Sequence, residues 1–98
     1  MEILIIGGGV GGLTLALSLH AAGIGCRVFE AAPEIRPLGV GINLLPHGMR
    51  ELTELGLQAR LAACAVETRE VCYYNRFGQR IFSEPRGRFA GYDWPQLS

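Results

Sequence analysis

The stretch that decides the fold is ILIIGGGVGGL, which occupies residues 3–13. The four residues before the first glycine are all apolar and mostly β-branched, as a strand buried on both faces requires. The glycines that follow match the pattern G-x-G-x-x-G, with Gly7, Gly9 and Gly12 at its fixed positions. A segment that is apolar nearly all round comes next, and Gly23 ends it. The stretch therefore predicts a strand, a tight turn and a helix packed on two sides.

Each glycine of the pattern has a mechanical role. Gly7 lets the chain turn sharply out of the strand, and Gly12 lets the helix lie close against it. At Gly9 a side chain would keep a pyrophosphate away from the backbone. The helix then begins with free N–H groups and a partial positive charge, and Val10 and Gly11 supply some of these donors. This turn is suited to an anion.

A second predicted strand, residues 26–29, ends in a carboxylate at Glu30. Glu30 lies 18 positions after Gly12, close to the roughly 20 expected for an acid that binds a ribose hydroxyl. Such a carboxylate accepts hydrogen bonds from the 2′-hydroxyl and repels a 2′-phosphate, so FAD or NAD is favoured over NADP. The alternative interpretation is that Glu30 is simply a solvated charge at the end of a strand. Gly8 also fills a variable position of the pattern, so we expect the turn to be more permissive than the pattern demands.

The rest of the chain predicts a second set of elements. Pro46 suits the first turn of a helix, and residues 57–64 predict another short helix. Residues 71–74 and 80–83 predict a hairpin, and the chain from Glu84 onward reads as irregular. The inner face of the first of these helices is expected to carry Met49, Leu52 and Leu55.

Composition excludes several classes of function. The formal net charge of the 98 residues is zero, so no electrostatic argument favours nucleic acid or a membrane surface as a partner. The three cysteines lack metal-type or redox spacing. Residues 3–26 carry no charge, but Glu2 precedes them and glycines interrupt them, which argues against a signal peptide or a membrane span. We expect a cytoplasmic protein with no metal site and no catalytic residue in this segment.

The predicted elements are too few for a complete nucleotide-binding domain. A Rossmann sheet needs at least three parallel strands with helices on both faces. The sequence supplies two parallel strands and one hairpin. We therefore expect an α/β chain with a truncated, Rossmann-like fold, made of a βαβ unit followed by helices and a β-hairpin. We expect such a chain to be the N-terminal part of a larger protein.

A second block of sequence points to one family. Residues 36–46 read RPLGVGINLLP, and Arg50, Leu52 and the triplet LGL at 55–57 follow. Together with residues 3–30, this block resembles the N-terminal segment of the FAD-dependent aromatic hydroxylases, the p-hydroxybenzoate hydroxylase type of flavoprotein monooxygenase. The resemblance covers essentially the whole chain. The positions that it assigns to cofactor binding are Gly7, Gly9, Val10, Gly11, Gly12, Glu30, Ala31, Arg36, Gly41 and Ile42.

The resemblance implies that different parts of the cofactor contact different positions. The adenosine end of FAD would lie at the glycine turn and Glu30, and Arg36 with the loop at 39–42 would lie near the ribose, ribityl or flavin. Family chemistry implies that NAD(P)H reduces the flavin, which then uses O₂ to hydroxylate a small, usually aromatic substrate. Residues 1–98 would be the N-terminal part of the FAD-binding domain, without the rest of that domain or the substrate domain, and inactive alone.

Two other functions stay open at this point. The chain could be the front of an NAD-dependent oxidoreductase, which shares the glycine turn and Glu30 but leaves the block at 36–57 unexplained. It could also be a non-enzymatic module that binds a nucleotide or self-associates. Self-association is expected in any case, because strand edges and apolar surface are left uncovered.

Overall fold

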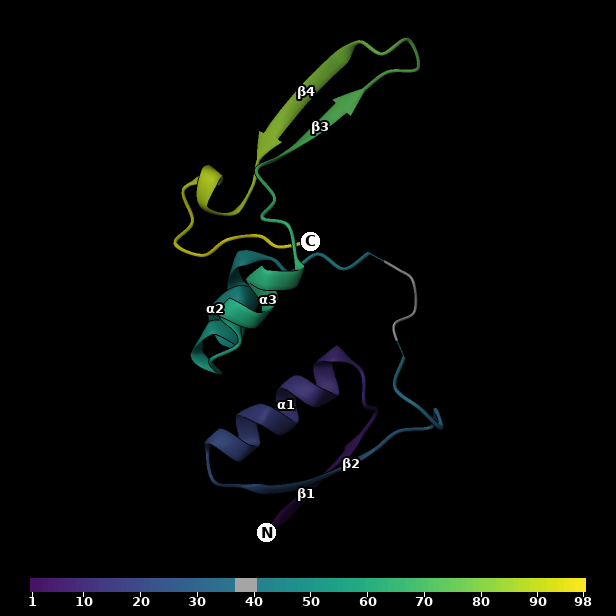
Figure 1. The fold of residues 1–98 in the computed structure, drawn as a ribbon, viewed down its shortest axis with the longest axis vertical. Helices are drawn as coiled ribbons and strands as arrows, with labels where there is room; N and C mark the ends of the chain where they lie inside the picture. Colours follow the sequence, from purple (N-terminus) through teal and green to yellow (C-terminus); the bar gives the residue numbers. More distant parts are fainter. Residues whose placement is uncertain (37–40) are drawn as a thin grey trace. The chain divides into compact units, whose positions relative to one another are not determined.

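A computed structural model describes residues 1–36 and 41–98 of the chain. It divides into two compact units, Met1–Val40 and Gly41–Ser98. The first unit holds strand β1 (Glu2–Ile6), helix α1 (Val10–Ala21) and strand β2 (Gly25–Phe29) (Figure 1). Residues 39 and 40 of the predicted cofactor loop lie outside the described residues.

The first unit is the strand–helix–strand arrangement that the sequence predicts. Strands β1 and β2 pair in parallel, from Glu2 opposite Gly25 to Ile6 opposite Phe29. Helix α1 packs against both strands, and Ile5 is buried beneath it. Because the register is unbroken, both strands end at the same edge of this small sheet.

The approach of α1 to β1 requires a glycine at position 12. A Cβ built on Gly12 would overlap the carbonyl oxygen of Gly7 and lie 3.4 Å from Cγ2 of Ile5. No side chain fits between the first turn of α1 and the end of β1. The role assigned to Gly12 from the pattern is therefore met in the structure.

The expected burial of the first unit on two sides is not observed. Helix α1 contains no buried residue, and Leu4 and Ile6 are 60% and 83% exposed. Side chains alternate along a strand, so Ile3 and Ile5 face α1 while Leu4 and Ile6 face the opposite side of the sheet. No described element of this unit covers that second side, which leaves its apolar residues exposed.

The second unit begins with two helices, α2 (Pro46–Glu54) and α3 (Gln58–Cys64). Pro46 occupies the first turn of α2, and Met49 and Leu52 are buried on its inner face, as the sequence predicts. Strands β3 (Glu70–Tyr74) and β4 (Arg80–Pro85) form the predicted hairpin, with antiparallel pairing and an irregularity at Tyr73 and Tyr74. No helix within the described residues is long and apolar enough to cross a membrane.

The segment after β4 is largely irregular, as the sequence predicts, and it also contributes to the core of the second unit. A 3-10 helix, η1, spans Gly87–Ala90, and Leu97 completes a core with Met49 and Leu52. The Leu97 and Leu44 backbones exchange two hydrogen bonds, of 2.8 and 3.0 Å. Val66 and Ser98 exchange two more, of 2.8 and 2.9 Å. These partners are distant in the sequence, so no local pattern reveals them.

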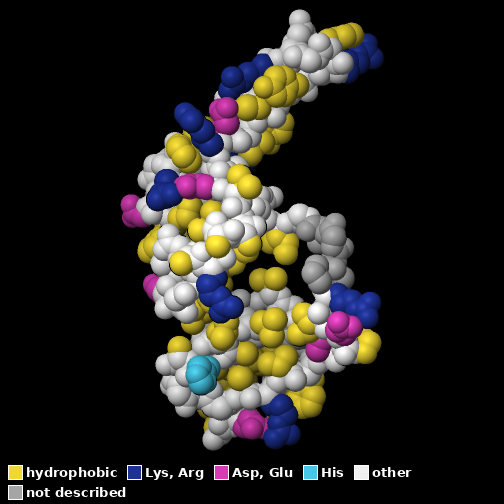
Figure 2. Space-filling model, in the orientation of Figure 1, with side chains coloured by type: hydrophobic (Ala, Val, Ile, Leu, Met, Phe, Trp, Pro, Cys, Tyr) yellow, Lys and Arg dark blue, Asp and Glu magenta, His cyan; other side chains and the backbone are white. Residues whose placement is uncertain are grey.

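The β3–β4 hairpin carries exposed apolar side chains. The rings of Tyr73 and Phe82 stack across the two strands with their centroids 4.5 Å apart. Phe77 at the turn and Ile81 on β4 are 73% and 63% exposed. Figure 2 shows hydrophobic side chains and arginines alternating along this hairpin. Isolated two-stranded hairpins are only marginally stable, so this one is expected to gain from a partner.

The contact at Gly12 gives a test of the first unit. We expect Gly12→Ala to lower the free energy of unfolding by about 1–3 kcal/mol, because the new Cβ must displace the Gly7 backbone. Urea unfolding followed by circular dichroism measures the change. The matched control is Gly11→Ala, whose Cβ would meet no atom within 4 Å. It should leave stability unchanged or raise it by up to about 1 kcal/mol. Equal stability of the two variants would contradict the contact.

Candidate dinucleotide-binding site

The turn after β1 depends on the backbone conformation of Gly7. Its φ angle is +110°, in the left-handed region that favours glycine. Its N–H donates a hydrogen bond of 2.7 Å to the carbonyl of Phe29, at the end of β2. The turn therefore leaves the sheet at the edge where both strands end, as the pattern predicts.

The N-terminus of helix α1 has no side-chain cap and is exposed. Gly9 is its N-cap residue, with no side-chain cap and no acidic residue in the first turn. The first helical hydrogen bond runs from the Leu13 N–H to the Gly9 carbonyl, 3.0 Å, so the N–H groups of Val10, Gly11 and Gly12 precede it. A Cβ at Gly9 or Gly11 would meet no atom within 4 Å. The described chain therefore leaves the space beside residues 9 and 11 open.

The carboxylate of Glu30 folds back onto this turn. Its Oε1 accepts a hydrogen bond from the Gly8 N–H (2.9 Å), and its Oε2 accepts one from the Ala32 N–H (2.6 Å). The Ala32 and Gly8 donors lower the pKa of Glu30 from its ordinary value, because they stabilise the charged form. The side chain stays exposed. An ionised carboxylate with a defined orientation therefore stands beside the start of α1.

Gly8 is less free than its variable position in the pattern suggests. It is buried, and a Cβ built on it would lie 3.2 Å from both Cβ and Cγ of Glu30. Residue 8 is therefore constrained in the structure. The reason is a tertiary contact between the turn and the end of β2, which the spacing of the glycines does not encode.

The remaining predicted cofactor-binding positions are all exposed. Ala31 is exposed, directly after Glu30. Arg36 is also exposed, and its Nη2 forms an ion pair of 2.8 Å with Oε2 of Glu34. Gly41 and Ile42 are exposed and belong to the second unit. The structure thus brings residues 7–12 together with Glu30 and Ala31. Cofactor roles for Arg36, Gly41 and Ile42 stay predictions.

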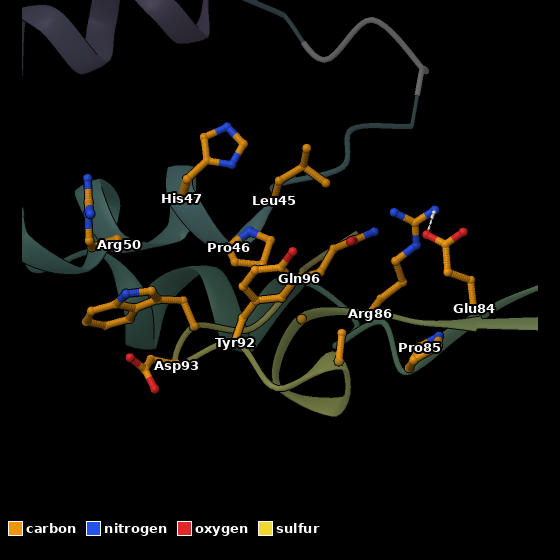
Figure 3. Close-up of a pocket in the computed structure, with 13 residues that line it drawn as sticks. Leu45, Pro46, His47, Arg50, Glu84, Pro85, Arg86, Tyr92, Asp93 and Gln96 are labelled. Carbon is orange, nitrogen blue, oxygen red and sulfur yellow. Dashed lines mark ion pairs between the residues drawn. The ribbon is translucent and has the colours of Figure 1, made fainter.

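The second unit holds a cavity of about 620 Å³ at the start of α2, beside the 3-10 helix and the tail (Figure 3). Pro46, Tyr92 and Gln96 lie together in its lining. Gln96 is only 5% exposed. Arg86 pairs with Glu84 at 3.1 Å, and its buried Nε has no partner among residues 1–36 and 41–98.

No sequence pattern predicts these cavity residues. Gln96 and Tyr92 lie in the segment that reads as irregular chain, and no spacing marks them as neighbours of Pro46. Their approach follows from the pairing of residues 96–98 with the chain at 44 and 66–68. Among the described residues, no group of three His, Cys, Asp or Glu side chains is arranged to hold a metal ion.

Comparison with known sequences places this chain among flavoproteins. A family model described as "FAD binding domain" matches residues 1–85. Phenazine 1,6-dicarboxylic acid hydroxylase PhzS of Lysobacter antibioticus is 50% identical over 98 residues, which is 99% of this chain and 24% of the relative. The 3-amino-4-hydroxybenzoate 2-monooxygenase of Streptomyces cremeus is 46% identical over 72% of this chain and 18% of the relative.

Solved structures show the same fold. The p-nitrophenol 4-monooxygenase PnpA of Pseudomonas putida DLL-E4 superposes with a TM-score of 0.83 at 26% identity, over 98% of this chain and 26% of that protein. HpxO of Klebsiella pneumoniae, solved with FAD and uric acid, gives a TM-score of 0.77 at 27% identity, over 100% of this chain and 25% of that protein. The chain thus spans about a quarter or less of the length of these relatives.

The lowered pKa of Glu30 predicts a pH-dependent contribution to stability. The carboxylate should stabilise the folded chain fully at neutral pH and lose this effect below pH 4.5, as the pH falls through the lowered pKa. We expect the stability difference between the wild type and Glu30→Gln to shrink between pH 7 and pH 3, measured by urea unfolding. Glu34→Gln is the control and should change stability little, because Glu34 forms an exposed ion pair with Arg36. A constant difference for Glu30→Gln would contradict the assignment.

Proposed function

This chain belongs to the FAD-binding domain family, and we propose that its glycine turn and Glu30 hold the adenosine diphosphate part of FAD. One observation carries the proposal. The open N-terminus of α1 and the oriented carboxylate of Glu30 lie at the same edge of the β1–β2 sheet. A diphosphate needs the first group and a ribose needs the second.

The residues present fit this part of the cofactor. The N–H groups of Val10, Gly11 and Gly12 would bind the pyrophosphate, and the missing side chains at Gly9 and Gly11 leave room for it. Each oxygen of Glu30 accepts one backbone hydrogen bond and has capacity for another, which the ribose hydroxyls would use. Ala31, next to this carboxylate, would line the same site.

We further propose that residues 1–98 serve as the N-terminal FAD-binding segment of a flavin-dependent monooxygenase that acts on a small aromatic substrate with NAD(P)H and O₂. The names of two relatives, the hydroxylase PhzS and the Streptomyces cremeus monooxygenase, support this class of reaction. When bound, the flavin would supply the redox chemistry. The residues of this chain would bind and orient the cofactor, with Arg36, Gly41 and Ile42 as further contacts. A cytoplasmic location stays a prediction.

Nucleotide titrations test the proposal. We expect FAD and ADP to shift the amide NMR signals of residues 7–12, whereas riboflavin, which lacks the adenosine diphosphate, should not. Glu30→Ala should weaken ADP binding by roughly tenfold or more, because hydrogen bonds to charged groups contribute about 1.5–3 kcal/mol. Glu34→Ala serves as the matched control and should bind ADP like the wild type. If millimolar ADP leaves the turn unperturbed, or if NAD⁺ binds and FAD cannot displace it, the FAD assignment is wrong.

We also propose that copies of the chain self-associate through the β3–β4 hairpin. Its support is the exposure of Phe77 and Ile81 together with free strand edges. Sedimentation should show a mass that rises with protein concentration, and the double variant Phe77→Ser and Ile81→Ser should weaken the association by at least about tenfold. Val66→Ser, at an exposed position outside the hairpin, is the control. A monomer at every concentration would refute the association.

A further inference from the structure

We propose that Gly8, which is not one of the fixed glycines of the pattern, is the positioning residue that aims the Glu30 carboxylate at the ribose of the nucleotide. Through this role Gly8 sets the preference of the site for a free 2′-hydroxyl. The inference rests on the proposed binding of an adenosine diphosphate at the glycine turn. Gly8 itself would touch neither the ribose nor the flavin, since it acts through Glu30.

The space around Gly8 is the first support. Gly8 is buried, and the Cβ of any other residue there would lie 3.2 Å from Cβ and Cγ of Glu30 and 3.7 Å from its Oε1. Contacts of 3.2 Å are tighter than nine in ten real Cβ contacts, so even a Cβ at residue 8 would require the Glu30 side chain to shift, and a bulkier side chain would require a larger shift. Gly9 and Gly11 differ, because a Cβ at either would meet no atom within 4 Å. The small size of Gly8 therefore serves Glu30, whereas that of Gly9 and Gly11 leaves space for a ligand.

The hydrogen bonds of the carboxylate are the second support. Its two oxygens are held separately, Oε1 by the Gly8 N–H at 2.9 Å and Oε2 by the Ala32 N–H at 2.6 Å. Two donors from two different segments fix both the position and the plane of the carboxylate. The side chain remains exposed, so the second lone pair of each oxygen is open to hydroxyl donors from solution.

This arrangement has a consequence for specificity. The Glu30 carboxylate is already oriented by two backbone N–H groups before the nucleotide binds. It therefore loses less conformational freedom on binding than a mobile carboxylate would, and its hydrogen bonds contribute more to affinity. It also cannot swing away from a ligand with a 2′-phosphate, whose negative charge it repels. If a bulkier residue displaced Glu30, both effects would weaken together.

The test compares ADP with 2′-deoxy-ADP, which differ only in the hydroxyl that Glu30 would bind. We expect the wild-type chain to prefer ADP by roughly tenfold, as a charge-assisted hydrogen bond implies. In Gly8→Val this preference should fall below about threefold. Glu30→Gln should lose preference similarly, and the double variant should lose no more than Glu30→Gln alone, because both changes remove one interaction. Calorimetry or NMR titration of the full chain gives the affinities.

A second readout separates positioning from general damage to the fold. Carbon-13 NMR of the Glu30 carboxyl should show its pKa rising towards the ordinary value in Gly8→Val, because the Gly8 N–H no longer reaches it. The control is Gly25→Val, at the start of β2, where a Cβ would meet no atom within 4 Å. It should keep both the ADP preference and the pKa. If Gly8→Val does not fold, Gly8→Ala takes its place with the same readouts.

The outcomes are distinct. If the wild type prefers ADP and the Gly8 variant keeps the full preference with an unchanged Glu30 pKa, the positioning role is refuted while the proposed function stands. If the wild type binds neither ADP nor FAD, the proposed function fails first. A loss of ADP preference that Gly25→Val shares would also refute a specific role for Gly8.

Discussion

The close approach of α1 to β1 at Gly12 is the constraint on which the first unit depends. With no side chain at residue 12, the first turn of the helix lies against the Gly7 carbonyl. Gly7 can then turn the chain directly from strand into helix, at a φ of +110°. The free N–H groups of the helix therefore stand at the end of β1. The unbroken parallel register places the end of β2, and with it Glu30, beside them.

Backbone donors in this turn have two different uses. The Gly8 N–H points inward and is satisfied by Glu30, at 2.9 Å. The N–H groups of Val10, Gly11 and Gly12 precede the first helical bond and keep no acceptor in the described chain. One donor thus orients a protein carboxylate, and its neighbours are left for an anion. The glycines that look equivalent in the sequence differ accordingly in what surrounds them.

The second unit depends on a segment that carries little pattern of its own. Leu97 is buried against Met49 and Leu52, and its backbone pairs with Leu44, more than fifty residues earlier. A two-pronged ion pair between Arg88 and Glu67, with N···O distances of 2.7 and 2.6 Å, joins η1 to the chain before β3. It lowers the pKa of Glu67 and raises that of Arg88.

The amino-acid sequence by itself determined the local elements. Apolar periodicity and glycine spacing predicted β1, α1 and β2, Pro46 predicted the start of α2, and alternation predicted the hairpin. The resemblance of the block at 36–57 indicated the family that comparison then showed. Only the tertiary structure decided three features: the hydrogen bond from Gly8 to Glu30, the burial of Gln96 and Leu97, and the exposure of Leu4 and Ile6 on the second face of β1. The physical reason is that periodicity reports which way a residue faces along its own element. It does not report which distant atoms occupy the space that the residue faces.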